Sequence, residues 1–300
     1  MIARTAARVR AHLEEFSGKL SAGLPKAARR LISEVVYGIA ARQSVRLTKI
    51  SRALEEAIPL VKTETRLSRN LGRPELRHHI GAAVLREGAH QVRERTLLIL
   101  DTSDIAKPYA EKMQYLARVR DGSAGEIADG YWLCQVIGVE NEDNAIVPLY
   151  NTLYSQRAPD FVSENAEIKT AMAAVSEAVK GRGVWVVDRG GDRGTLYEDM
   201  ITHGRSFIIR QKGERHLLWG MQSRSTADLA RDCPLSFATH ITREEGGKEV
   251  RCRLDYGFRS VRLSADGGDS FFDFARHQSV HGSDRNCRRP HFADFDGEAG

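Results

Sequence analysis

Residues 97–104 read LLILDTSD, and residues 184–194 read VWVVDRGGDRG. In each stretch four apolar residues are followed directly by an aspartate, Asp101 in the first and Asp188 in the second. Short apolar runs bounded by turn residues predict buried strands of a sheet. An aspartate directly after such a strand is expected where the apolar sheet opens to solvent. The two stretches therefore predict two buried strands that each end in a carboxylate.

Two neighbouring strands of this kind would bring the two carboxylates close together. Two ionised carboxylates at short distance repel each other, and a divalent cation removes that cost. Carboxylate oxygens suit Mg²⁺ or Mn²⁺, and bound metal ions of this kind promote phosphoryl transfer. We therefore predict a metal site formed by Asp101 and Asp188. The alternative is that each aspartate only forms a turn or caps a helix.

The charge of the chain is unevenly distributed. The 300 residues carry a net charge of +5, but residues 1–92 hold 17 Lys and Arg, 8 Glu and no Asp, which is a net charge of +9. Such a basic region favours an anionic partner, and nucleic acid is the first candidate. A solvated helical surface is the alternative. No apolar run reaches the ~18 residues that cross a bilayer, and four irregularly spaced cysteines favour reduced thiols, so we expect a cytoplasmic protein without a membrane partner.

Residues 1–92 predict a helical region, because apolar residues recur every three or four positions between glycines and prolines. Pro59 is predicted to stop the third helix, and a fourth follows over residues 63–71. Its Arg, Ser, Thr and Asn residues suit docking on DNA in the manner of a helix–turn–helix. The candidate DNA-binding residues on one exposed face are Arg66, Arg69 and Arg73. A plain bundle with exposed arginines is the alternative.

The pattern from residue 93 to about 215 predicts a mixed α/β domain. Strands are predicted at 97–105, 131–140, 145–154, 184–187 and 206–210, a polar loop at 107–129, and helices around 168–179 and 195–202. Three antiparallel strands followed by helix, strand, helix and strand is the order of a ribonuclease H-like domain. In that architecture the first and fourth strands are neighbours at the centre of the sheet.

The segments around Asp101 and Asp188 resemble the DDE transposases of the insertion-sequence-4 family, as does the helical region around residues 62–68. The Asp-Arg-Gly that begins at Asp188 is the most informative motif, and the likeness covers residues 40 to 263. The resemblance implies that both aspartates belong to a catalytic triad and bind Mg²⁺. It implies cleavage of double-stranded DNA at transposon ends and strand transfer into target DNA. We also expect a homodimer.

Two arginines that follow the second strand are further candidates for DNA binding. Arg189 and Arg193 could hold DNA phosphates, because a guanidinium forms paired hydrogen bonds with phosphate oxygens. They could equally pair with the aspartates beside them.

The third acid of the family is a glutamate that stands in a pattern begun by Tyr and Arg. From Tyr256 and Arg259 the Glu position falls on Leu263 and the following Lys position on Ser270. Residues 264–300 contain no Leu and no Ile but five of the ten Phe, and no helical or strand period. We interpret this change as loss of the reading frame near residue 264, which would remove the third carboxylate.

The expected organisation has four parts: a helical DNA-binding region at 1–92, the first part of a ribonuclease H-like core at 93–215, a β-rich insertion at 216–263 and an aberrant, disordered tail at 264–300. Three functions stay open. The first is a DDE transposase impaired by a missing carboxylate. The second is an inactive remnant that binds DNA, and the third is another metal-dependent nuclease with an unrecognised third ligand.

Overall fold

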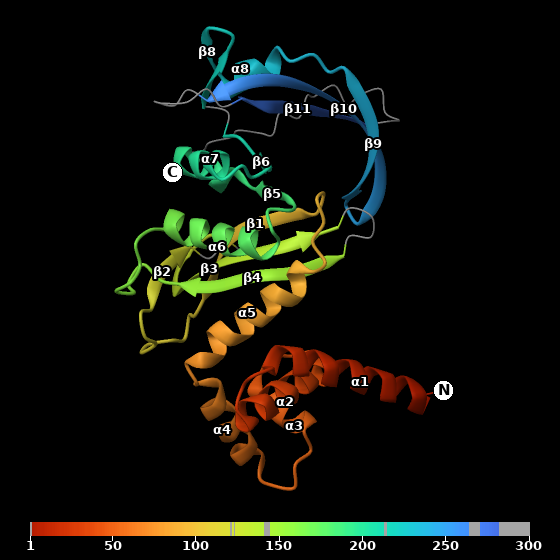
Figure 1. Ribbon diagram of the computed structural model, residues 1–300, viewed down its shortest axis with the longest axis vertical. Helices are drawn as coiled ribbons and strands as arrows, with labels where there is room; N and C mark the ends of the chain where they lie inside the picture. Colours follow the sequence, from red (N-terminus) through yellow and green to blue (C-terminus); the bar gives the residue numbers. More distant parts are fainter. Residues whose placement is uncertain are drawn as a thin grey trace. The chain divides into compact units, whose positions relative to one another are not determined.

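A computed structural model describes residues 2–120, 122, 124–140, 145–212, 215–263 and 271–281, the last range by its backbone alone (Figure 1). The chain divides into two compact units. Unit 1 comprises Met1–Asp188 and Arg193–Ile208, and unit 2 comprises Arg189–Asp192 and Ile209–Gly300. Helices and the first sheet make up unit 1, whereas a second sheet makes up most of unit 2. No helix of the described ranges is long and apolar enough to cross a membrane.

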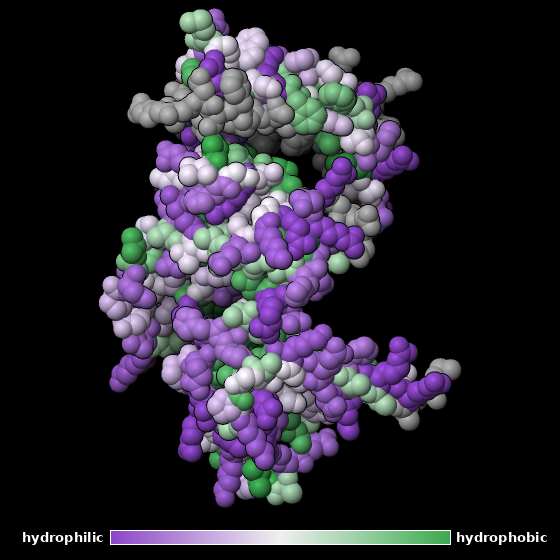
Figure 2. Space-filling view, in the orientation of Figure 1, coloured by the Kyte–Doolittle hydropathy of each residue, from purple (hydrophilic) through white to green (hydrophobic). Residues whose placement is uncertain are grey.

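The N-terminal region of unit 1 is helical. Its helices are α1 (Ile2–Ser21), α2 (Lys26–Arg42), α3 (Leu47–Ala53), α4 (Leu60–Leu71) and α5 (Glu75–Ala89). Leu31, Ile50 and Leu67 are buried in the core that these helices share. Gly38 allows α2 and α3 to approach closely, because a Cβ there would lie 2.5 Å from the side chain of Ile50. Hydrophilic residues cover most of the face shown over α1–α4 (Figure 2).

The boundary between α3 and α4 differs from the predicted one. The periodicity favoured a third helix that continues to Pro59, but α3 ends at Ala53, and Glu55 adopts a left-handed conformation with a φ of 48°. Pro59 is the N-cap residue of α4. Proline is tolerated at a helix start because the first turn needs no N–H donor there. Consequently α4 begins at Leu60, and Val61 and Lys62 belong to it.

Unit 1 also contains a mixed sheet. Its strands are β1 (Leu97–Ala106), β2 (Ala117–Arg120), β3 (Ile127–Val139), β4 (Ile146–Tyr154), β5 (Val184–Val187) and β6 (Phe207–Ile209). The strand order is β2-β3-β1-β5-β6, and β4 pairs with β3 as well. β1 is antiparallel to β3 and parallel to β5. The expectation of a mixed α/β architecture is therefore confirmed.

Strand β2 lies within the segment that we predicted to be a polar loop. Its buried Ala117 and Val119 alternate with the exposed Arg118 and Arg120, and its backbone pairs with the start of β3. An alternation over only four residues is too short to predict a strand within a polar segment. The backbone pairing with the long β3 stabilises this short strand.

Two helices of unit 1 connect the last strands of its sheet. α6 (Glu164–Ala178) contacts β3 and β4 and covers a face of the sheet in Figure 1. Ser163 is its N-cap, and its hydroxyl accepts the N–H of Ala166 at 3.1 Å. α7 (Gly194–Thr202) follows β5.

Unit 2 consists mainly of strands. They are β7 (His216–Trp219), β8 (Gln222–Ser225), β9 (Phe237–Glu245), β10 (Lys248–Leu263) and β11 (Phe271–His281), with the short helix α8 (Thr226–Arg231) between β8 and β9. The order is β11-β10-β7-β8, and β9 also pairs with β10.

Strand β11 corrects the prediction that the tail has no regular structure. Its backbone pairs antiparallel with β10, from Cys252 opposite His281 to Arg262 opposite Phe271. Strand pairing uses backbone hydrogen bonds, so it does not require a side-chain period. Residues 264–270 and 282–300, which we also expected to be disordered, lie outside the described residues.

Arg66 belongs to an ion-pair network that joins α2 and α4. Its Nη1 lies 2.6 Å from Glu34 Oε2, and its Nη2 lies 2.9 Å from Glu56 Oε2. Arg30 pairs with the same two glutamates at 2.6 and 2.7 Å. The hydroxyl of Thr63 donates to Glu56, and this hydrogen bond together with Arg66 lowers the pKa of the Glu56 carboxyl. The network fixes the N-terminal half of α4 against α2.

The network predicts the effect of removing Arg66. The substitution Arg66→Ala should lower the free energy of unfolding by about 1 to 2 kcal/mol at neutral pH, because each half-buried glutamate loses one of its cations. Urea unfolding followed by the helical circular dichroism signal measures this change. The ionised form of Glu56 stabilises the fold above its unfolded pKa, and this contribution is lost as the pH falls through the lowered folded pKa. The difference between wild type and variant should therefore shrink in acid.

The matched control is Arg69→Ala, which removes an exposed arginine from the same helix. It should change the free energy of unfolding by less than about 0.5 kcal/mol. Equal destabilisation by the two variants at neutral pH would contradict the role given to the network.

Candidate active site

The register of β1 and β5 places Asp101 beside Asp188. Leu97–Leu100 pair in parallel with Val184–Val187, and each aspartate is the next residue after the last pair. Adjacent strands of a sheet lie about 4.8 Å apart. Asp188 is therefore the first residue after β5, and Asp101 lies beside it within β1, at the point where the pairing of β1 with β5 ends. The prediction that these two strands are neighbours is confirmed.

The electrostatics of this pair are unfavourable when both groups are ionised. Loss of hydration raises the pKa of the Asp101 carboxyl, the negative charge of Asp188 raises it further, and a hydrogen bond from the Thr102 backbone opposes these effects. Both residues nevertheless keep access to solvent. The arrangement is thus an accessible pair of oxygen ligands whose mutual repulsion a cation would relieve.

The two strands end at different positions relative to their aspartates. β5 ends at Val187, whereas β1 continues to Ala106 along β3. In open α/β sheets ligands commonly bind outside the carboxyl ends of the strands, where neighbouring chain segments separate. Both aspartates are exposed at the point where β5 ends and β1 continues beside β3.

The first turns of α6 and α7 lie at the same edge of the sheet, because α6 follows β4 and α7 follows β5, and both strands run parallel to β1. Arg193 joins these two helix starts. Its Nη2 lies 2.6 Å from Glu164 Oε1, and its Nη1 donates to Asn165 Oδ1 at 2.8 Å. This joining role differs from the predicted contact of Arg193 with DNA phosphate. The predicted contact of the half-buried Arg189 stays a prediction.

The described part of the chain offers no third ligand to this pair, since it holds no group of three or more His, Cys, Asp or Glu suited to a metal ion. The carboxylate of Asp104 accepts the N–H of Gly122 at 3.1 Å. Asp192 is buried, lies 2.5 Å from Arg215 Nε and accepts the N–H of Lys212 at 2.9 Å. Both aspartates therefore have structural partners.

The position at which the transposase pattern has its glutamate holds no acidic residue in this chain. Leu263, at the Glu position of the pattern, is the last residue of β10. Ser270, at the Lys position, lies outside the described residues.

The three arginines predicted for DNA binding do not share one exposed face. Arg66 is half-buried between its two glutamates. Arg73 lies beyond the end of α4, so helical spacing does not apply to it, and its Nε donates to Asn70 Oδ1 at 3.1 Å. Only Arg69 of these three is exposed on α4.

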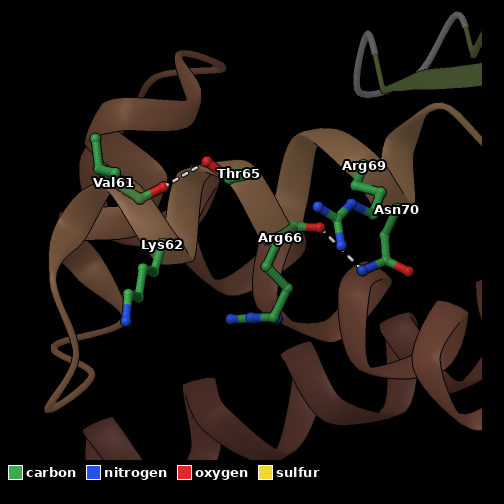
Figure 3. A pocket seen from close by; sticks show the side chains of 6 residues that line it. All are labelled: Val61, Lys62, Thr65, Arg66, Arg69 and Asn70. Atoms are coloured by element: carbon green, nitrogen blue, oxygen red, sulfur yellow. Dashed lines mark hydrogen bonds between the residues drawn. The ribbon is translucent and has the colours of Figure 1, made fainter.

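An open pocket of about 320 Å³ lies along α4 beside Arg69 (Figure 3). It is lined by Val61, Lys62, Thr65, Arg66, Arg69 and Asn70. The prediction missed Val61 and Lys62 because it began the helix at residue 63. The helical spacing of these two residues relative to the apolar Leu67, which puts them on another side of the helix, is the sequence signal that would have identified them.

Comparisons with known proteins leave the family of the chain open. No protein-family model matches the sequence, and no curated protein matches it. Among solved structures, the chain is similar to a piggyBac transposase in a cryo-EM structure of its synaptic complex with hairpin DNA, at a TM-score of 0.35 and 8% sequence identity. The match covers 92% of this chain and 52% of the other, so the chain spans about half the length of that transposase. A likeness this low assigns neither a family nor a fold.

Proposed function

We propose that this chain is a transposase of the DDE class, which cleaves and joins DNA by phosphoryl transfer at Asp101 and Asp188 and whose activity is impaired by the missing third carboxylate. The observation that carries the proposal is the parallel register of β1 and β5, which sets the two aspartates side by side at the point where the pairing of these strands ends. Two separate stretches of similar design, which are 87 positions apart in the chain, meet at this point.

The strand order of the first sheet supports the proposal. An antiparallel group of β1, β3 and β4 is followed by α6, β5, α7 and β6, and β5 lies beside β1. Apart from the short additional strand β2, this order agrees with the one that we expect of a ribonuclease H-like core, and this agreement supports the proposal. In such a core the acids of the first and fourth principal strands bind the catalytic metal.

The chemistry of the paired carboxylates fits a divalent cation. They are hard oxygen donors, one of them is partly desolvated, and each raises the cost of ionising the other. Asp101 and Asp188 would hold Mg²⁺ or Mn²⁺, which when bound activates an attacking oxygen and stabilises a leaving oxygen. The basic helices of residues 1–92 supply attraction for the DNA backbone.

A second candidate function is DNA binding without cleavage. It is favoured by the finding that the described residues place no third acidic or histidine ligand beside the aspartate pair. A DDE site that lacks its third carboxylate would hold its metal weakly, and loss of the reading frame near residue 264 would have this effect. The two candidates share the DNA partner and differ in catalysis.

Mg²⁺-dependent nicking tests the proposal. The full chain is incubated with a supercoiled plasmid that carries its own gene and the flanking DNA, and nicked and joined products are separated on a gel. The wild type should nick the plasmid, and Asp188→Asn should lower the rate by at least about 100-fold, because one of the two ligands is lost. Joining of a cut end to a second duplex distinguishes a transposase from another nuclease.

The matched control for this assay is Asp104→Asn. Alternate residues of a strand face opposite sides of the sheet, so Asp104 does not share the face of Asp101, and its carboxylate is bound to Gly122. The control should retain nicking. If the wild type binds DNA but does not nick it, the second candidate function replaces the first.

The effect of Mg²⁺ on stability gives an independent test. At neutral pH without metal, Asp101→Asn should raise the free energy of unfolding by less than about 1 kcal/mol, because it removes a solvent-screened repulsion with Asp188. Millimolar Mg²⁺ should raise the melting temperature of the wild type but not that of the variant. Equal stabilisation of both proteins by Mg²⁺ would show that the ion binds elsewhere.

A further inference from the structure

The outward side of α4 carries exposed residues in a continuous stripe. Val61, Lys62, Thr65, Ser68 and Arg69 are exposed, whereas Thr63 and Leu67 on the inward side are buried. Val61 exposes 70% of its surface although it is apolar. The stripe runs from the first turn of the helix to the last, and Figure 3 labels four of its residues, Val61, Lys62, Thr65 and Arg69. We call these five exposed residues the α4 face.

The inward side of α4 is held from two directions. The network of Arg66 with Glu34 and Glu56 fixes it to α2 and to the loop before α4. The hydroxyl of Thr48 on α3 donates a hydrogen bond to Glu64 of α4 at 2.9 Å, so this acidic side chain is bound to α3. The helix is therefore positioned by its inward side, and Arg66 is a positioning residue.

We propose that α4 enters the major groove of double-stranded DNA and reads base sequence with the α4 face. This proposal rests on the proposed function only for its choice of DNA as the partner. A helix of 12 residues is about 18 Å long and of a diameter that the major groove admits. The surrounding charge is complementary to DNA, because residues 1–92 have a net charge of +9 and the adjacent α3 region exposes Arg46, Lys49 and Arg52.

Four side chains of the α4 face suit distinct contacts. The guanidinium of Arg69 can pair with O6 and N7 of guanine, and the methyl groups of Val61 can contact the methyl group of thymine. Lys62 suits a phosphate, which positions the helix without reading sequence. The Thr65 hydroxyl donates to the carbonyl of Val61 at 2.7 Å, so it presents an acceptor and a methyl group outward.

The proposal predicts that Arg69 contributes sequence preference and Lys62 contributes general affinity. Duplexes that the full-length wild type prefers are first selected from a randomised library in the presence of EDTA, so that cleavage does not intervene. Affinities for the selected duplex and for a scrambled duplex are then measured by fluorescence anisotropy. Arg69→Ala should weaken binding to the selected duplex by about 10-fold or more and to the scrambled duplex much less. Lys62→Ala should weaken both equally and reduce the salt dependence by about one phosphate contact.

The control variant is Arg86→Ala, which removes an exposed positive charge from α5 instead of α4. It should change both affinities by less than about 2-fold, and circular dichroism shows whether each variant is folded. The proposal is overturned if the library yields no preferred sequence, or if Arg69→Ala weakens both duplexes by the same factor. If the α4 proposal fails in this way but the wild type still nicks DNA, the proposed function stands. If the wild type binds a preferred sequence but does not nick DNA, the α4 proposal stands and the proposed function fails.

Discussion

Repulsion between the carboxylates of Asp101 and Asp188 is the constraint on which the candidate active site depends. The backbone pairing of β1 with β5 places the two residues beside each other, because the apolar residues before them are buried in the core. Leu98, Leu100, Trp185 and Val187 are all buried. Gly183 contributes to this packing, since a Cβ at its position would lie 2.8 Å from the side chain of Leu98. The fold therefore places two acidic residues next to each other, and we propose that a bound cation offsets the cost of ionising both.

The two proposed sites rely on opposite electrostatics. The sheet edge is acidic and would repel DNA phosphates unless metal ions neutralise it, whereas the N-terminal helices are basic and attract the same phosphates. Their rigidity also has different origins. Buried apolar strands fix the aspartates, and half-buried ion pairs between Arg66, Glu34 and Glu56 fix α4. Salt should therefore weaken the binding of DNA to the helices more than it disturbs the geometry of the acidic pair.

Local patterns in the sequence were sufficient to predict the central strands and their aspartates. The apolar runs identified both strands, but only β5 ends at its aspartate, whereas β1 continues past Asp101 to Ala106. The same reasoning failed for Arg66, because its partner Glu34 lies 32 residues earlier and only tertiary packing brings the two together. It also placed the end of α3 too late and missed β2 and β11. Apolar spacing continues past Ala53 although the backbone turns at Glu55, and strand pairing depends on distant partners.

The central claim is that Asp101 and Asp188 share one divalent cation. Anomalous X-ray diffraction from crystals of the full chain grown with Mn²⁺ tests it most directly, because manganese scatters anomalously and takes the same oxygen ligands as Mg²⁺. The account predicts an anomalous peak within coordination distance of both carboxylates, and no peak there in crystals of Asp188→Asn. A well-ordered site without manganese, or with the metal bound elsewhere, would contradict it.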